Sequence, residues 1–211
     1  MDKFSPQVSK NHYFNIKYDS KQRWISYWYQ IFEVISKNPN KVLEIGVGNK
    51  IVSSYLKKNK INVTTCDFDK SLRPDVVADI RKLPFKNEEF DIILCAEVLE
   101  HLPFNEFSKI LRELSRVSKK YIILSLPHFS ITNFYFGIKL IPFIPKKEIY
   151  IKIDFPFSHR YDGEHYWEIG KKNFNLKKIK KIIEKSKLKI VSNYFPYENP
   201  KHHFFILEKI K

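Results

Sequence analysis

The stretch that decides the fold is Lys41-Val-Leu-Glu-Ile-Gly-Val-Gly48. Its aliphatic residues predict a short buried strand, and its glycine pair predicts a tight turn in which the backbone approaches a ligand closely. The third glycine of a dinucleotide-binding GxGxxG motif would fall at position 51, which is Ile51 here. The Gly-Lys-Ser/Thr sequence of a phosphate-binding P-loop is also absent. Both of these nucleotide-binding motifs are therefore excluded.

Short apolar runs and amphipathic stretches alternate on both sides of this strand. The apolar runs predict strands at 41–46, 61–66, 75–79, 90–96 and 121–126. The amphipathic stretches predict helices at 21–37, 51–58 and 105–118. Strands separated in this way by helices predict a parallel sheet that is covered on both faces.

The second half of the chain departs from this alternation. The segment from His128 to Trp167 is aromatic and interrupted by prolines, and we expect an irregular insert there. After it, a basic helix at 175–187 and strands at 188–195 and 202–207 predict an antiparallel closing pair. His202 and His203 begin the last strand, so one should face inward and the other outward.

Four segments carry a family resemblance: VLEIGVG from Val42, TTCDFD from Thr64, VVADIRKLPF from Val76 and FDIILCAEVLEHL from Phe90. In this order and spacing they resemble the class I S-adenosylmethionine-dependent methyltransferases, over roughly Lys41 to Pro127. The resemblance implies an α/β, Rossmann-like fold with a mostly parallel seven-stranded sheet, helices on both faces and an antiparallel C-terminal strand. It also implies that the chain is an enzyme with S-adenosyl-L-methionine as its cofactor.

The same resemblance implies roles for eight residues. The methionine part of the cofactor would be surrounded by Glu44, Gly46 and Gly48, with Glu97 beneath it. Asp67 would hold the ribose and Phe68 would border the adenine, whose amino group would meet Asp79 and the Ile80 amide. The chain departs from the family at one position, because the third glycine of the family's GxGxG is Lys50 here.

We interpret residues 1–211 as one methyltransferase domain. Its expected parts are an N-terminal helical cap (1–40), a cofactor-binding core (41–127), an acceptor-side insert (128–170) and a C-terminal helix with a strand pair (171–211).

A metal site is a further hypothesis. If Glu97 opened a helix, Glu100 and His101 would share its face, and two carboxylates with an imidazole can ligate a divalent cation. Gly163-Glu-His165-Tyr-Trp-Glu168 adds a later histidine. Together these segments look like the small-RNA 3′-terminal 2′-O-methyltransferases, and the ubiquinone-biosynthesis O-methyltransferases share the ExxEH element. This resemblance implies Mg²⁺ held by Glu97, Glu100, His101 and His165.

The same segment is frequent among methyltransferases that use no metal. His101 would then pack beneath the cofactor, or His101 or His165 would act as the general base for a hydroxyl acceptor. We expect O-methylation of a vicinal diol or catechol in a small molecule or sugar, or in a lipid-linked acceptor. The alternatives are an RNA 2′-O-methyltransferase and a regulatory protein that binds the cofactor without turnover.

The charge of the chain bears on these alternatives. There are 38 Lys and Arg against 23 Asp and Glu, a formal net charge of +15. Only six of the 38 cations are Arg, the side chain that phosphate and base recognition favour, so the excess is mainly a solvated surface. RNA remains a possible partner, with the basic helix at 175–187 as a groove wall. DNA is unlikely, because no Asp/Asn-Pro-Pro-aromatic motif follows the fourth strand.

Two further features bear on location. The chain begins without a charged-then-apolar signal peptide, and Cys66 and Cys95 form no CxxC pair, so we expect a cytoplasmic protein without a zinc ribbon. The apolar stretch Phe129 to Pro145 is too short to span a bilayer and carries Lys139, but it could make peripheral membrane contact.

Overall fold

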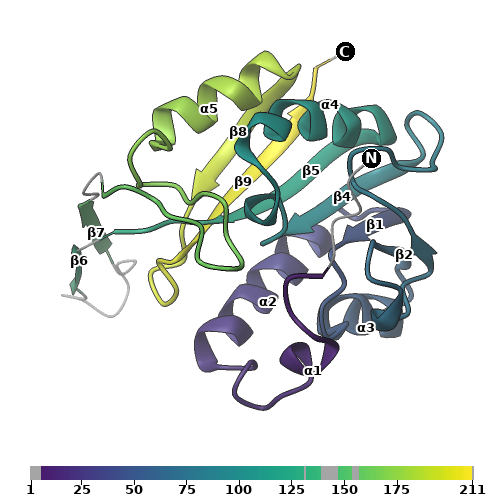
Figure 1. Ribbon diagram of the computed structural model, residues 1–211, viewed down its shortest axis with the longest axis horizontal. Helices are drawn as coiled ribbons and strands as arrows, with labels where there is room; N and C mark the ends of the chain where they lie inside the picture. The colour runs from purple at the N-terminus through teal and green to yellow at the C-terminus, as the bar shows by residue number, and fades with distance from the viewer. Residues whose placement is uncertain (1–5, 131, 139–146, 154–156, 211) are drawn as a thin grey trace.

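The computed structural model describes residues 6–130, 132–138, 147–153 and 157–210. Within these residues a seven-stranded sheet has the order β3-β2-β1-β4-β5-β9-β8 (Figure 1). β1 to β5 are parallel, and β9 is antiparallel to both of its neighbours. The strands are β1 Lys41–Ile45, β2 Asn62–Asp67, β3 Val76–Val77, β4 Phe90–Ala96, β5 Ser118–Pro127, β8 Leu188–Tyr194 and β9 His202–Lys209.

Helices cover both faces of this sheet, with α2 and α3 on one face and α4 and α5 on the other (Figure 1). α1 precedes α2, and three short 3-10 helices connect the elements. The α-helices are α1 Lys10–Tyr13, α2 Lys21–Ile35, α3 Ile51–Lys58, α4 Phe107–Val117 and α5 Leu176–Lys185. The 3-10 helices are η1 Lys70–Leu72, η2 Leu99–His101 and η3 Phe104–Glu106.

The central strands are buried on both faces, which explains their continuous apolar sequences. In β4, Ile92 and Leu94 pack with α2 and α3, whereas Ile93 and Cys95 pack with α4 and α5. Successive side chains of a strand point to opposite faces, so a strand between two helical layers needs apolar residues at every position. The α/β, Rossmann-like fold expected from the sequence is confirmed.

The element ends differ from the expected ones for local reasons. β5 starts at Ser118 because Ser118 pairs with Phe90 across a register shift in β4. α4 starts at Phe107 because Pro103 caps a separate 3-10 turn before it. β3 is reduced to two residues that pair with the end of β2.

The expectation of an irregular insert is wrong for part of it. β6 (Thr132–Ile138) and β7 (Lys147–Ile153) form a separate antiparallel two-stranded sheet. Their sequences, TNFYFGI and KEIYIKI, are rich in β-branched and aromatic residues, which favour strands. Positions 131 and 139–145 of the apolar Phe129 to Pro145 stretch lie outside the described residues. Among the described residues no helix is long and apolar enough to cross a membrane.

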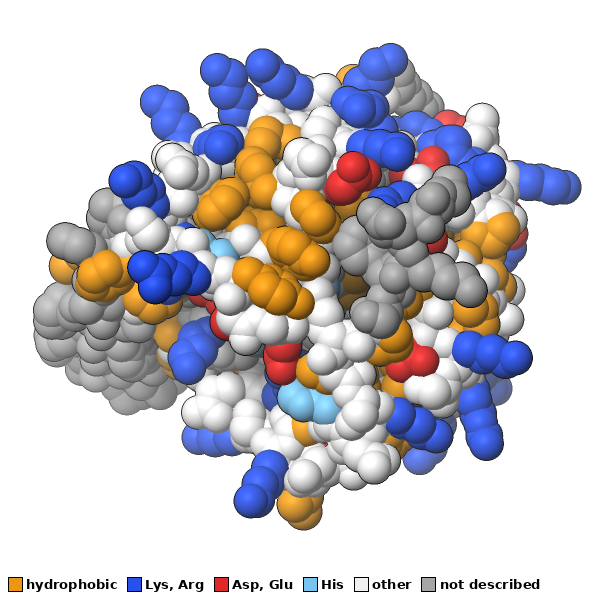
Figure 2. Space-filling model, viewed as in Figure 1, with side chains coloured by type: hydrophobic (Ala, Val, Ile, Leu, Met, Phe, Trp, Pro, Cys, Tyr) orange, Lys and Arg blue, Asp and Glu red, His pale blue; other side chains and the backbone are white. Residues whose placement is uncertain are grey.

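Lys and Arg side chains spread around much of the outline of the face shown in Figure 2. The basic helix α5 contributes to this pattern, with Ile179 and Ile183 buried beneath exposed lysines. This spread agrees with an excess of positive charge that is mainly solvated.

The insert is attached to the domain through Trp167, and this contact gives a stability prediction. The Trp167 side chain is fully buried against Phe104 and Phe107, and its Nε1 donates a hydrogen bond to the Leu102 carbonyl at 3.1 Å. Trp167→Ala should lower the free energy of unfolding by about 3–5 kcal/mol, since it leaves a cavity and an unpaired carbonyl. Urea denaturation measures this loss.

Trp28→Ala is the matched control, because Trp28 is 56% exposed. It should change the free energy of unfolding by about 0.5 kcal/mol or less. Equal losses in the two variants would contradict the anchoring role of Trp167.

Candidate active site

A cavity of about 1070 Å³ lies at the carboxyl ends of the parallel strands. Its walls are the turns after β1, β2, β4 and β5, the N-terminal segment around α1 and the start of β9. The chain order reverses between β1 and β4, and ligands of open α/β sheets bind at such a reversal. The topology therefore provides a binding crevice at this cavity.

The turn after β1 has the backbone angles that glycine favours. Gly46 has φ +80° and Gly48 has φ +47°. A Cβ on Gly46 would lie 2.3 Å from Cγ2 of Val98, so the turns after β1 and β4 meet without room for a side chain. Lys50, at the family's third glycine, also has a left-handed φ of +64°. The chain thus keeps the backbone shape of the turn with a lysine there, at a steric cost of about 1 kcal/mol.

Asp67 joins the turns after β1 and β2. Its Oδ2 accepts a hydrogen bond from the Val47 amide at 2.9 Å, and its Oδ1 accepts one from the Asp69 amide at 2.9 Å. Each oxygen keeps a lone pair for a ribose hydroxyl. Burial raises the pKa of Asp67 above its ordinary value. Phe68, which is 49% exposed, lines the cavity next to it.

Asp79 and Ile80 line the cavity beyond β3. The Asp79 carboxylate accepts hydrogen bonds from the amide and the guanidinium of Arg81. These bonds lower the pKa of Asp79 and hold its carboxylate in the ionised form. The Ile80 side chain is buried in the core, so its backbone is the part that can meet a ligand.

Glu44 is a buried carboxylate in the cavity wall. It is 5% exposed, and its Oε2 has no hydrogen-bond partner among the described residues. Burial raises the pKa of Glu44 to about 7, although Ser53 and Lys57 act in the opposite direction. An unpartnered acceptor beside the glycine turn suits a ligand that brings a hydrogen-bond donor or a positive charge.

Glu97 begins the turn after β4. Its φ of +54° is left-handed, and its amide donates to the Ser125 carbonyl at 3.0 Å. Its Oε1 accepts a hydrogen bond from Ser125 Oγ at 2.7 Å and lies 3.6 Å from Nδ1 of His202. A helix that begins at Glu97 and places Glu97, Glu100 and His101 on one face is not present, because this turn leaves only η2 (Leu99–His101) helical.

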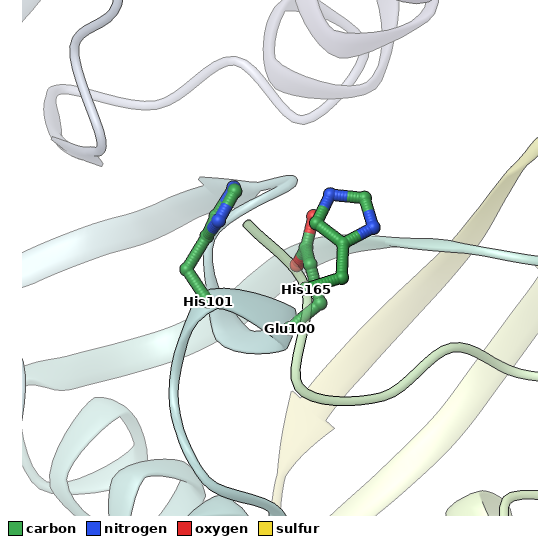
Figure 3. A group of neighbouring side chains, drawn as sticks. All are labelled: Glu100, His101 and His165. Atoms are coloured by element: carbon green, nitrogen blue, oxygen red, sulfur yellow. The ribbon is translucent and has the colours of Figure 1, made fainter. Parts of the chain in front are cut away.

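Three of the four predicted metal ligands lie together (Figure 3). Glu100 and His101 extend from η2, and His165 comes from the insert. One donor atom from each lies within 4.8 Å of the other two, whereas Glu97 is outside this group. The Glu100 side chain is fully buried, and both of its carboxylate oxygens lack a hydrogen-bond partner among the described residues. Burial, reinforced by the charge of Glu97, raises the pKa of Glu100 well above its ordinary value.

Backbone contacts bring His165 to this place from 64 residues further along the chain. The Tyr166 amide donates to the Glu100 carbonyl at 2.8 Å, and the insert returns to β5 through a bridge between His128 and Ile169. The Asp162 carboxylate accepts from the amides of Glu164 and His165 at 2.9 and 2.7 Å. These bonds fix the insert loop against η2.

Neighbouring groups also fix both imidazole rings. Nδ1 of His101 lies 3.0 Å from the Glu164 carbonyl, and Nδ1 of His165 lies 2.9 Å from Oε1 of Glu168. A carbonyl or carboxylate only accepts, so each Nδ1 donates and each neutral ring keeps a lone pair on Nε2. Burial, followed by His165, lowers the pKa of His101. Burial also acts to lower the pKa of His165, but Glu168 reverses this effect and the pKa is raised.

Several cavity residues were missed by the sequence analysis. His202 lines the cavity, and its Nδ1 lies 2.9 Å from Ser26 Oγ, whereas its neighbour His203 is buried in the core. The Arg23 guanidinium stacks on the Tyr18 ring at 3.9 Å and donates to its hydroxyl. The expectation that one of the two histidines faces outward is wrong, because His203 is 2% exposed and His202 lines the cavity. Nothing in the sequence connects α2 with the ends of β4 and β9.

The family of the chain follows from this geometry together with its sequence. Residues 43–124 match the family described as methyltransferase domain. The matched part runs from β1 into β5 and includes the glycine turn, Asp67 and Glu97. The resemblance and the enzyme class expected from the four segments are thereby confirmed. No curated protein matches the sequence.

Solved methyltransferase structures have the same fold. The 1,6-didemethyltoxoflavin-N1-methyltransferase of Burkholderia thailandensis, with bound 1,6-didemethyltoxoflavin and S-adenosylhomocysteine, has a TM-score of 0.63 at 12% identity, covering 95% of this chain and 85% of that chain. A Clostridium acetobutylicum ATCC 824 methyltransferase has a TM-score of 0.61 at 12% identity, covering 95% of this chain and 97% of that chain. Magnesium protoporphyrin IX methyltransferase of Synechocystis PCC 6803, with bound SAM, has a TM-score of 0.56 at 15% identity, covering 89% of this chain and 79% of that chain.

The buried Glu44 gives the methyltransferase a predictable pH dependence. Its pKa rises from 4.5 when unfolded to about 7 when folded, so folding favours the protonated form. The stability that this provides is present below pH 4.5 and is lost as pH rises through 7. The loss is on the order of 3 kcal/mol. Glu44→Gln should remove this part of the pH dependence of urea denaturation.

Asp75→Asn serves as the control, because the pKa of the more exposed Asp75 is lowered and its contribution has the opposite sign. The same fall in stability between pH 5 and pH 7 in wild type and Glu44→Gln would contradict the role of Glu44.

Proposed function

We propose that the enzyme transfers a methyl group from SAM to a hydroxyl oxygen of a small molecule or sugar, beside a bound divalent cation. The observation that carries this proposal is the buried Glu100 carboxylate, which faces two imidazoles at the cavity and has no hydrogen-bond partner within the described part of the chain. A vicinal diol or a catechol is the acceptor that such a site suits, because two adjacent oxygens can bind one cation.

The cavity suits the cofactor at one end. The unpartnered Oε2 of Glu44 fits the ammonium of the methionine part, and the glycine turn lets the backbone approach it. Asp67 has lone pairs for the ribose, and the turn from Phe68 to Ile80 would border the adenine. The volume of about 1070 Å³ exceeds the ~300–1,000 Å³ usual for one ligand. The remaining space, on the side of His165 and His202, is assigned to the acceptor.

The ligand group suits a divalent cation. Glu100 supplies a carboxylate, and His101 and His165 supply Nε2 lone pairs, while their Nδ1 atoms are held by Glu164 and Glu168. A cation would also compensate the charge of the buried carboxylate. Two imidazoles suit Mn²⁺ or a similar transition metal better than the expected Mg²⁺, which prefers oxygen ligands. Glu97, next to this group, would complete the ligand set after a change of rotamer.

The chain's own residues would then position the reactants, exclude water and, without a cation, accept the proton of the hydroxyl. SAM supplies a methyl group on a sulfonium, which is transferred by in-line displacement, so positioning and exclusion of water dominate the catalysis. The N-terminal segment contributes to both, since Gln7 donates a hydrogen bond to the His101 carbonyl at 3.1 Å and Tyr13 lies against Gly48. A bound cation would orient the hydroxyls and lower their pKa. Without a cation, Nε2 of His101 or His165 would accept the hydroxyl proton.

A small acceptor also agrees with the similar structures. The Burkholderia thailandensis enzyme holds 1,6-didemethyltoxoflavin, and the Synechocystis enzyme is a magnesium protoporphyrin IX methyltransferase. RNA remains the competing acceptor because of the ExxEH resemblance. A lipid-linked sugar would present the same hydroxyl chemistry as a free one.

The metal hypothesis predicts that purified protein binds Mn²⁺ in calorimetry and that EDTA abolishes methyl transfer. Glu100→Gln should weaken Mn²⁺ binding by at least about a hundredfold, because it removes a charged ligand. His165→Ala should also lose the metal but should keep its affinity for S-adenosylhomocysteine.

Glu164→Gln is the matched control for Glu100→Gln, because the Glu164 carboxylate lies outside the ligand group and only its carbonyl contacts His101. Full activity in EDTA, or equal Mn²⁺ affinities in the two Gln variants, would refute the metal site.

The acceptor prediction is tested with SAM carrying a labelled methyl group and fractionated cell extract. We expect the label in small molecules, as a methyl ether on a diol or catechol, and we expect periodate to cleave the unmethylated diol acceptor but not its product. Label in RNA, measured as counts that ribonuclease releases, would favour the alternative. S-adenosylhomocysteine binding without any transfer would show a cofactor-binding protein without turnover.

A further inference from the structure

The outer side of α2 exposes a stripe of large apolar side chains. Trp24, Trp28, Phe32 and Ile35 are 52%, 56%, 49% and 43% exposed. Their spacing of three or four residues places them along one side of the helix, and the rings of Trp28 and Phe32 stack at 5.1 Å. Tyr55 of α3, 48% exposed, lines a shallow groove together with these residues. We call these five residues the aromatic face.

The aromatic face is not required by the core. α2 already buries Tyr27 and Val34 against the sheet on its other side, so it is apolar on two sides. An amphipathic surface helix normally presents charged residues to water, as α5 does with its exposed lysines. Contiguous exposed apolar side chains on one element mark an interaction surface.

The charge around the aromatic face indicates the kind of partner. α2 and α3 together have one acidic side chain, Glu33, which is 8% exposed and paired with Lys37 at 3.0 Å. Lys21 begins α2, and Lys58 ends α3 one turn after Tyr55; both are exposed. The surface of these helices is therefore aromatic and positively charged, without an exposed carboxylate. A second copy would bring an equally positive face against it, in a chain of net charge +15.

We propose that the aromatic face binds the surface of an anionic phospholipid bilayer. Tryptophan and tyrosine rings partition to the level of the lipid headgroups, and flanking lysines are attracted to anionic lipids. The helix would lie in the plane of the interface, with its inner side still packed on the sheet. That inner side carries Arg23 and Ser26, which line the active cavity. Binding would therefore hold the cavity wall one helix away from the membrane, whatever the acceptor is.

Co-sedimentation of the full chain with vesicles tests this inference. We expect binding to phosphatidylcholine vesicles that contain phosphatidylglycerol, weaker binding to phosphatidylcholine alone, and loss of binding as salt is raised. Tryptophan emission should shift to shorter wavelength on binding. Two of the three tryptophans belong to the aromatic face, and the third, Trp167, is fully buried and should not respond.

Two pairs of variants give matched controls. Trp24→Ala with Trp28→Ala should reduce vesicle binding by about tenfold or more, whereas Tyr161→Ala with Val191→Ala, which truncates side chains of similar exposure elsewhere, should not. Lys21→Glu with Lys58→Glu should reduce binding to the anionic vesicles, and Lys177→Glu with Lys185→Glu on α5 should reduce it less. Thermal unfolding checks that each variant is folded.

Three outcomes would overturn the proposal. The first is no binding to either kind of vesicle. The second is binding that the tryptophan pair does not change. The third is a dimer in light scattering that the tryptophan pair dissociates, because a second copy would then cover the aromatic face. None of these measurements involves methyl transfer, so they are independent of the proposed acceptor.

Discussion

Burial of the central parallel strands on both faces is the constraint on which the rest of this structure depends. β4 lies between β1 and β5, and its residues from Ile92 to Cys95 are at most 1% exposed. Polar side chains are excluded from such a strand, so they gather where it ends. Glu97, Glu100 and Ser125 lie at the carboxyl ends of β4 and β5 for this reason. The cavity therefore lies at the carboxyl edge of the sheet, where charged side chains replace the apolar residues of the strands.

Charge at that edge differs from the charge of the whole molecule. The chain is strongly basic, yet its cavity contains the buried carboxylates Glu44, Asp67 and Glu100. Burial raises the pKa of each of these groups, and Glu44 and Glu100 have oxygens without a hydrogen-bond partner in the parts of the chain that the structure describes. Buried acceptors of this kind destabilise the folded chain unless a ligand brings donors or positive charge. The cofactor is a ligand of that kind, and the proposed cation would be a second one.

Much of this arrangement could be predicted from the sequence, because it rests on local signals. The apolar runs predicted the seven strands of the main sheet, and the two glycines after β1 adopt the left-handed angles of the predicted tight turn. These local signals do not predict the backbone of segments that lack a regular pattern of apolar residues. The left-handed φ of Glu97 is not encoded by any residue preference, so the sequence left open whether a helix begins there. The hairpin of β6 and β7 is not predicted, because prolines disfavour strands and interrupt the segment that contains its strand-forming residues.

The sequence by itself determined which residue types stand at the ends of the strands, since strand periodicity and turn chemistry act over a few neighbouring residues. Only the tertiary structure decided which of those residues meet. His165 reaches Glu100 because the Tyr166 amide donates to the Glu100 carbonyl and because the buried Trp167 anchors the insert in the core. His202 reaches Glu97 because β9 inserts antiparallel beside β5. Such contacts join segments about 65 and 105 residues apart, and they depend on the packing of the whole sheet rather than on any local pattern.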